Sequence, residues 1–173
     1  ELLIQQRSAS KTLWPLFWSN SCCSHPRKGE TMIEAVNRRL YDELGLSEFS
    51  LKYIYQFSYV AKYKNIGTEK ELCSVYLGKI GSEINVNLNE INDSKFVSKD
   101  ELDELLRVGE KNTPWFLMEW RELNLKYNFL CTVLEAPFTS IADVAPSVLP
   151  GADSPHAVIP SSIISIKTFC DSE

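Results

Sequence analysis

The sequence predicts one domain of the α/β (α+β) class, with a mixed β-sheet packed between helices. Residues 30–46 carry the apolar stripe and end signals of an amphipathic helix, and residues 51–63 alternate as a half-buried strand does. Further helix signals follow near residues 98 and 113. A chain of 173 residues is long enough for one well-buried domain and too short for two ordinary ones.

The elements follow in order along the chain. The run Leu2-Leu3-Ile4 predicts a strand, and because no methionine precedes it we expect a fragment that lacks an N-terminal segment. In the helix over 30–46, Thr31 and Glu34 form a capping-box pair and Gly45 is a favoured residue just past the end. Its apolar stripe consists of Ile33, Val36, Leu40 and Leu44.

Two strands and two helices are expected next. Residues 51–63 and 69–78 predict strands, and the apolar face of the first consists of Leu51, Tyr53, Tyr55, Phe57 and Tyr59. Ser98 and Glu101 open a short helix to about residue 107. Thr113-Pro114 opens another, because proline is favoured at the first helical position.

The composition changes at about Thr132. Five of the eight prolines fall between Pro137 and Pro160, among serine and alanine with few charges. We therefore expect a domain over 1–131 and a Pro/Ser-rich tail over 132–173 that is disordered or a linker.

Composition and charge exclude several classes of protein. With 44% hydrophobic and 24% charged residues, no membrane-length apolar run and no signal-peptide pattern, the chain is expected to be a cytoplasmic protein without a membrane span, and a monomer. Five irregularly spaced cysteines indicate free thiols, not a disulfide framework. A net charge of −5 without a basic stripe argues against nucleic acid. A local excess of basic residues in the first 39 positions instead favours a small anionic ligand.

The helix over 30–46 resembles a Nudix box (Gly-x5-Glu-x7-Arg-Glu-U-x-Glu-Glu-x-Gly-U, where U is aliphatic). Six positions match: Glu30, Arg38, Leu40, Glu43, Gly45 and Leu46. Asp42 replaces one glutamate conservatively, and Ser24 stands at the opening glycine. Arg39 replaces the glutamate that a pyrophosphatase of this fold needs for its metal cluster, and an arginine there suits binding of a diphosphate better than its cleavage.

Cys23 and His25 lie just ahead of this helix. A thiol is a useful acid, base or nucleophile where nearby cations or a helix N-terminus favour the thiolate. Taken alone, the pair is more often a buried small residue and a loop imidazole. Cys22 is expected to be a packed neighbour, and Arg39 with Glu43 one turn later is by itself an ordinary ion pair.

Glu69 and Glu71 share one face of the second strand because they are two residues apart. A Glu-Lys-Glu segment ordinarily lies at the solvent-exposed end of a strand. With His25 the two carboxylates make a plausible nitrogen–oxygen metal set, but three ligands rarely complete a site. Trp120 lies in a helix rich in aromatic residues, and aromatic residues at helical spacing usually pack in the core. The face of a tryptophan ring can also stabilise a cation by roughly 0.5–2 kcal/mol.

From about Leu2 to about Cys131 the chain resembles type I isopentenyl-diphosphate delta-isomerases, Nudix-fold enzymes that interconvert isopentenyl and dimethylallyl diphosphate. The motifs that carry the resemblance, in order, are Arg7-x3-Lys11-x2-Trp14-Pro15, Trp18-x-Asn20-Ser21-Cys22-Cys23-Ser24-His25-Pro26, Arg38-Arg39 with Glu43-Leu44-Gly45, Phe57-x-Tyr59, Glu69-x-Glu71-x-Cys73, and Thr113-Pro114-Trp115 with Trp120. Each is weak alone, and their order and spacing together are specific.

The resemblance implies a role for each of these groups. Cys23 would be one acid–base group and Glu71, assisted by Tyr59, the other, with Trp120 facing the carbocation between them. His25, Glu69 and Glu71 would bind Zn²⁺ or Mg²⁺/Mn²⁺, and Glu43 would hold a Mg²⁺ that bridges to the diphosphate. The oxygens of this small-molecule diphosphate substrate would be contacted by Arg7, Lys11 and Arg39.

The chain also departs from the family. Its members carry two further metal-binding histidines upstream of the first strand, whereas this sequence has only His25 and His156. We therefore expect the chain as given to bind metal poorly and to show little or no turnover, and an added upstream segment to restore both. The alternatives are a Nudix pyrophosphohydrolase of a nucleoside diphosphate derivative and a catalytically impaired diphosphate-binding module. A cysteine hydrolase is more distant, because Cys-x-His is poor geometry for a base approaching a nucleophile.

Overall fold

The structure is a computed structural model that describes residues 1–81, 83–109, 111–127 and 162–170. Its strands are β1 (Leu2–Arg7), β2 (Trp18–Asn20), β3 (Cys22–Ser24), β4 (Phe49–Tyr63), β5 (Gly67–Ile80), β6 (Ile91–Val97) and β7 (Ser162–Cys170). Its helices are α1 (Met32–Leu44), α2 (Lys99–Val108) and α3 (Pro114–Tyr127). No helix within these ranges is both long and apolar enough to cross a membrane.

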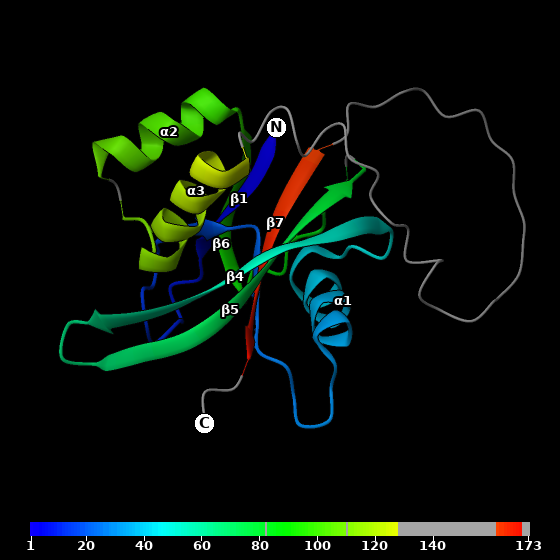
Figure 1. The fold of residues 1–173 in the computed structure, drawn as a ribbon, viewed down its shortest axis with the longest axis horizontal. Helices are drawn as coiled ribbons and strands as arrows, with labels where there is room; N and C mark the ends of the chain where they lie inside the picture. The colour runs from blue at the N-terminus through cyan, green and yellow to red at the C-terminus, as the bar shows by residue number, and fades with distance from the viewer. Residues whose placement is uncertain (82, 110, 128–161, 171–173) are drawn as a thin grey trace, which may run out of the picture.

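The described strands form one mixed sheet. Its main path runs β2-β1-β7-β5-β4, with β3 paired to β7 and β6 to β1. β7 is parallel to β1 and β3, and the other pairings are antiparallel. Helix α1 covers one face, while α2 and α3 cover the other (Figure 1). The predicted fold class, a mixed sheet between helices, is confirmed.

The predicted capping signals form the helix ends. Thr31 is the N-cap of α1 and makes both bonds of a capping box with Glu34, and Gly45 ends the helix in the left-handed conformation with φ of 67°. Ser98 is likewise the N-cap of α2 and makes both bonds of a capping box with Glu101. Helix α1 therefore begins and ends where local sequence dictates, which fixes the positions of Arg39 and Glu43 along it.

The expected apolar face of β4 is interrupted. The β4–β5 register shifts between Tyr53 and Tyr55, as at a β-bulge, so the side chains before the shift change faces. Leu51 packs in the core beside α1, Tyr53 is exposed, and Tyr55 and Tyr59 pack in the core beside α3. The prediction of one continuous face over residues 51–59 was therefore wrong, because alternation alone does not reveal a bulge.

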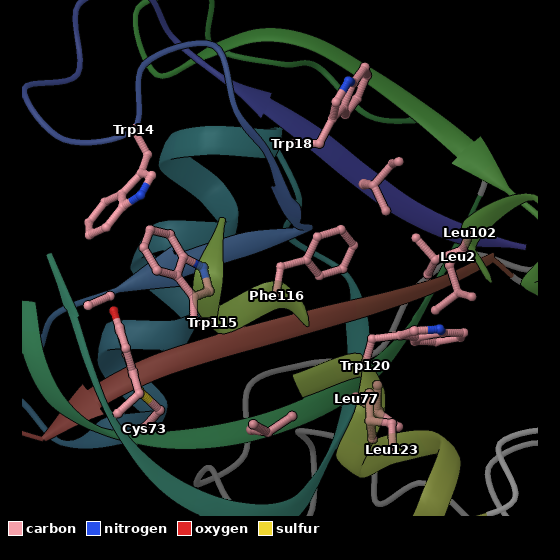
Figure 2. Packing of buried hydrophobic residues seen from close by; sticks show 14 of the residues in the cluster. Leu2, Trp14, Trp18, Cys73, Leu77, Leu102, Trp115, Phe116, Trp120 and Leu123 are labelled. Carbon is pink, nitrogen blue, oxygen red and sulfur yellow. The ribbon is translucent and has the colours of Figure 1, made fainter. Parts of the chain in front are cut away.

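The sheet separates two apolar cores. Leu3, Val36, Leu40 and Leu44 belong to the core beneath α1. The other core is aromatic, and Figure 2 shows Trp115, Phe116 and Trp120 of α3 packed there with Trp14 from the loop after β1. Trp14 and Trp115 meet edge to face with ring centroids 5.2 Å apart. Both cores anchor the strands that carry the cavity described below.

The expected tail is described only in part. Residues 162–170 form β7, which pairs with β1 and β3 on one side and with β5 on the other, so for these nine residues the expectation of a linker or disordered segment does not hold. The run Ser-Ile-Ile-Ser-Ile-Lys-Thr-Phe-Cys is rich in β-branched residues that favour strands. The boundary at 131/132 lies outside the described residues, and the division of the chain there stays a prediction.

Candidate active site

One cavity of about 300 Å³ contains most of the residues singled out from the sequence. It lies where the end of β1, strand β3, helix α1 and the start of β5 meet. Its lining consists of Gln5, Arg7, Lys11, Cys23, His25, Arg27, Arg38, Arg39, Glu43, Glu69, Glu90 and Trp115. Seven of the ten predicted site residues are among them, drawn from segments far apart in the sequence.

At one end of the cavity, which we call the helix end, Lys11, Arg39, Glu43 and Glu90 form a charge network. Arg39 donates to the carboxylate of Glu43 one turn further along α1, and also to Glu90 Oε2 at 3.1 Å. Lys11 donates to the same oxygen of Glu90. Each cation therefore meets a carboxylate, and Glu90 links the two cations.

Glu90 was not predicted from the sequence. The segment that carries it is bonded to two other elements: Ser8 N–H donates to the Glu90 carbonyl at 3.0 Å, and Asn87 N–H donates to the Glu43 carbonyl at 2.9 Å. These bonds place the Glu90 side chain between the loop after β1 and helix α1. A lone glutamate in an irregular segment gives no sequence signal for such long-range contacts.

The pKa shifts at the helix end follow from burial and pairing. Burial raises the pKa of Glu43 against the opposing effect of Arg39. Burial opposes the charged form of Arg39, but the neighbouring carboxylates, Glu43 first, outweigh it and raise the pKa of the guanidinium. For Glu90, burial is outweighed by Lys11 and Arg39, which lower its pKa. The network thus contains a buried carboxylate that depends on its partners to remain charged.

Cys22 is fully buried beside Glu43. Burial, reinforced by that carboxylate, raises the pKa of the Cys22 thiol well above its ordinary value. It therefore remains protonated, as the interpretation of Cys22 as a packed neighbour requires.

Arg7 is held by the loop it precedes. Its guanidinium donates to the carbonyls of Leu13 at 3.0 Å and Trp14 at 3.2 Å, and lies 5.3 Å from the ring centroid of Trp115. These contacts use two of its nitrogens to fix the loop and direct the group toward the cavity.

Arg38 organises the loop between β3 and α1. Its guanidinium donates two bonds to Glu30, at 2.7 and 2.9 Å, and one to the carbonyl of His25 at 3.1 Å. The bond from Arg38, followed by that from the backbone of Arg27, lowers the pKa of Glu30 to about 2. Arg38 therefore has a structural role next to the predicted ligand His25.

A second group of residues, which we call the hairpin end, consists of Cys23, His25, Tyr59, Glu69 and Glu71. Cys23, His25 and Glu69 line the cavity, whereas Tyr59 and Glu71 are not among its lining residues. Tyr59 lies directly opposite Glu71 in the β4–β5 register, and its hydroxyl is 2.8 Å from Glu69 Oε2 and 2.6 Å from Glu71 Oε2. His25 Nε2 is 3.2 Å from Glu71 Oε1. Burial, then the bond to Glu71, raises the pKa of Tyr59 well above its ordinary value. One hydroxyl thus connects two carboxylates.

Cys23 reaches this cavity from β3 as a free thiol. Its Sγ donates to Asn20 Oδ1 at 3.2 Å, and the same oxygen accepts the indole N–H of Trp115 at 3.3 Å. The amide of Asn20 is oriented by its own bond to the Cys22 carbonyl at 2.9 Å. A buried asparagine therefore couples the thiol to the tryptophan that lines the cavity.

The two tryptophans of α3 have different surroundings. Trp115 lines the cavity, and its ring centroid is 5.9 Å from that of Tyr59. Trp120 is buried in the aromatic core, and its indole N–H donates to Asp103 Oδ1 at 2.7 Å. Trp120 is not among the residues that line the cavity, so its predicted role of facing a cation stays a prediction.

Of the four predicted metal ligands, Glu43, His25 and Glu69 line the cavity, and Glu71 lies next to His25. Among residues 1–81, 83–109, 111–127 and 162–170, no group of three or more His, Cys, Asp and Glu side chains is arranged to hold a metal ion. The donor types still fit: His25 with Glu69 and Glu71 offers nitrogen and oxygen, as zinc or manganese accepts, and Glu43 offers the oxygen that magnesium prefers. His156 lies outside the described residues.

Comparison with known proteins gives two results. The model of the NUDIX domain matches residues 1–117. The chain is 41% identical over 125 residues to isopentenyl-diphosphate Delta-isomerase 1 of Photorhabdus laumondii, and these residues cover 71% of this chain and 71% of the relative. It is 40% identical to the isopentenyl-diphosphate Delta-isomerase of Salmonella arizonae (69% of this chain, 64% of the relative) and 38% identical to that of Salmonella typhi (69% and 67%).

Proposed function

Because the chain belongs to the Nudix family and, within it, to the isopentenyl-diphosphate Delta-isomerases, we propose that it interconverts isopentenyl and dimethylallyl diphosphate in isoprenoid biosynthesis. The single observation that carries this proposal is the composition of one cavity. Its lining combines paired cations at the helix end with the Cys23 thiol and the Glu69 carboxylate, and Glu69 is linked to Glu71 through the hydroxyl of Tyr59.

The reaction moves a double bond by two proton transfers. A proton is added to the terminal CH₂ carbon of isopentenyl diphosphate, which leaves a tertiary carbocation on the neighbouring carbon. A proton is then removed from the carbon on the other side of that cation, and the new double bond is that of dimethylallyl diphosphate. Atoms and charge balance without a redox partner, so the protein must supply one acid and one base.

Cys23 and Glu71 are the proposed acid–base pair. They lie on β3 and β5, which β7 separates: Cys23 is level with Val75, and Glu71 is four residues further along β5, so the backbones are about 10 Å apart laterally and about 13 Å apart along the strand. Val75 and Glu71 are an even number of residues apart, so Cys23 and Glu71 lie on the same face of the sheet, as groups that act on one ligand must. Tyr59, hydrogen-bonded to Glu71, would hold the carboxylate in place and relay its proton to Glu69. Each positioned proton transfer could contribute roughly 10²–10⁴-fold.

The helix end is the proposed diphosphate site. Lys11 and Arg39 present ammonium and guanidinium groups to the cavity, and Arg7 is held beside Trp115. A guanidinium matches the geometry of phosphate oxygens, while an ammonium acts as a point charge. Binding there would leave the five-carbon part of the substrate directed toward Cys23 and Trp115. Trp120 remains proposed as a further ring that stabilises the cation.

Divalent metals are part of the proposal. Glu43 would hold a Mg²⁺ ion, and His25, Glu69 and Glu71 a Zn²⁺, Mg²⁺ or Mn²⁺ ion. When bound, such ions neutralise charge on the diphosphate and on the paired carboxylates. The hairpin end fits a cation because it brings an imidazole nitrogen and two carboxylates together: His25 lies 3.2 Å from Glu71, and Glu69 and Glu71 meet at one tyrosine hydroxyl.

Isotope exchange tests the proposal. Isopentenyl diphosphate incubated in deuterated water with the full chain and Mg²⁺ should yield deuterated dimethylallyl diphosphate. Cys23→Ala and Glu71→Gln should each lower the rate by roughly 10²–10⁴-fold with the fold intact. The matched controls are Cys73→Ala, which changes a buried thiol that does not line the cavity, and Glu48→Gln, which changes an exposed carboxylate, and both should retain exchange.

The same samples separate the alternatives. A pyrophosphohydrolase would release phosphate from nucleoside diphosphate derivatives without isotope exchange. Arg39 argues against this outcome, because it stands where such an enzyme needs a carboxylate and is instead paired with Glu43 and Glu90. Tight diphosphate binding with neither reaction would identify a non-catalytic binding module.

A further inference from the structure

We infer that Gln5 provides its side-chain carbonyl oxygen, directly or through one water molecule, to the divalent cation held by Glu43. The inference rests on the proposed function, because it concerns the cation that accompanies a bound diphosphate. It adds to the site a residue that the sequence motifs did not indicate.

The observation behind it is a buried polar atom without a partner. Gln5 lies on β1 with its side chain in the cavity wall and is only 4% exposed. Its Nε2 donates to Glu43 Oε2 at 3.2 Å, whereas its Oε1 is buried and accepts no hydrogen bond from any described residue. A buried carbonyl without a partner costs free energy, so such atoms in native proteins usually have a specific explanation.

The orientation of this amide follows from its neighbour. An ionised carboxylate only accepts hydrogen bonds, so the NH₂ group of Gln5 must face Glu43 and the carbonyl must point elsewhere. Gln6, the next residue, has both ends of its amide bonded on the other side of the strand: it donates to the Leu16 carbonyl and accepts from Asn92. Two adjacent glutamines therefore differ in whether their oxygen has a partner.

The chemistry of the missing partner is restricted. Gln5 Oε1 needs a donor or a cation, and an ionised diphosphate offers only acceptor oxygens. Two of the predicted diphosphate contacts, Lys11 and Arg39, are already bonded to carboxylates. A hydrated divalent cation meets the requirement, because Mg²⁺ and Mn²⁺ take carbonyl and carboxylate oxygens and keep several waters that can donate. Gln5 and Glu43 would then present two oxygens to one ion.

The test measures binding of Mn²⁺ by electron paramagnetic resonance, with inorganic diphosphate present and no turnover. Gln5→Met keeps the size and removes the amide, and should weaken Mn²⁺ binding roughly 10- to 100-fold, as loss of supporting ligands does elsewhere. The matched control Gln6→Met should stay within about twofold of the original chain. Unchanged Mn²⁺ affinity in Gln5→Met, or no Mn²⁺ binding by the original chain with diphosphate, would overturn the inference.

A second variant covers the case in which Gln5→Met does not fold. Gln5→Glu puts a second carboxylate beside Glu43, so Mn²⁺ should raise its melting temperature more than it raises that of the original chain. An equal or smaller rise would also overturn the inference. The isomerisation assay is independent: Mn²⁺ binding that depends on Gln5 in a chain that does not isomerise would count against the proposed function and leave this inference standing.

Discussion

The helix end and the hairpin end of the cavity balance their charges in different ways. At the helix end, Lys11 and Arg39 meet Glu43 and Glu90, so each charge has an opposite charge within direct contact. At the hairpin end, Glu69 and Glu71 share the single hydroxyl of Tyr59, and the imidazole that reaches Glu71 belongs to a side chain that is 67% exposed.

The difference indicates which end is complete. The helix end is formed by α1 and the loops bonded to it, and its ions stabilise one another before any ligand arrives. The hairpin end instead brings two carboxylates to one tyrosine hydroxyl, an arrangement of like charges that a proton or a cation between them stabilises. We therefore expect the binding of diphosphate and of the cation that accompanies it to depend mainly on the helix end, and turnover mainly on the hairpin end.

The largest expected effect comes from breaking the helix end. Arg39→Gln leaves the buried carboxylate of Glu43 without its partner, which should lower the free energy of unfolding by about 3 kcal/mol. Urea denaturation monitored by circular dichroism measures this change. Lys99→Gln removes a partly exposed cation from an i, i+4 pair with Asp103 and should cost less than about 1 kcal/mol. Equal losses in the two variants would show that Glu43 does not depend on Arg39.

The next effect is at the hairpin end. Tyr59→Phe keeps the ring packed against Trp115 but removes the hydroxyl that is bonded to both Glu69 and Glu71. The turnover number should fall roughly 10- to 100-fold, as for other groups that orient catalytic carboxylates. Affinity for inorganic diphosphate, measured by calorimetry, should remain within about twofold, because the helix end is unchanged. A loss of diphosphate affinity as large as the loss of turnover would mean that the two ends are not separate.

A smaller effect is expected from Glu90→Gln. The variant removes the carboxylate that competes with a bound anion for Lys11 and Arg39. Inorganic diphosphate should bind up to about fivefold more tightly, which corresponds to roughly 1 kcal/mol for a partly exposed ion pair. The gain should shrink at high salt, and calorimetry at two ionic strengths measures it. Weaker binding in Glu90→Gln would instead assign Glu90 to orienting the two cations.

The smallest effect concerns pH. The pKa of Glu30 is lowered to about 2 from an ordinary value of 4.5, chiefly by Arg38. A depressed carboxyl pKa stabilises the fold above the unfolded value and loses this contribution as the pH falls from about 4.5 to about 2. Glu30→Gln should therefore flatten the acid limb of stability against pH in that window, as thermal melts at several pH values would reveal. An unaltered acid limb would contradict the role given to the Arg38–Glu30 pair.

Local sequence was sufficient for the elements that have strong end signals. The capping boxes of Thr31 with Glu34 and of Ser98 with Glu101 form as expected, because each depends on residues three apart. The long strands β4 and β5 were also predicted, but the bulge between Tyr53 and Tyr55 was not. A bulge is a property of a strand pair, and one strand's alternation does not contain it.

The residues of the candidate site likewise fall into those that sequence motifs indicate and those that only long-range contacts bring to the cavity. The motifs indicated Cys23, His25, Arg39 and Glu43 as cavity residues, and the cavity contains them. They did not indicate Gln5 or Glu90, whose contacts join residues 38 and 79 positions apart along the chain.

By itself, the sequence determined the fold family, the helix boundaries and the residue types that meet at the cavity, because periodicity, capping and motif spacing are local or ordered along the chain. Only the tertiary structure decided that Trp115 lines the cavity while Trp120 lies in the core, that β7 lies between β3 and β5, and that one carboxylate links Lys11 to Arg39. Those relations depend on which distant segments pack together, and many different sequences satisfy the same local pattern without sharing them.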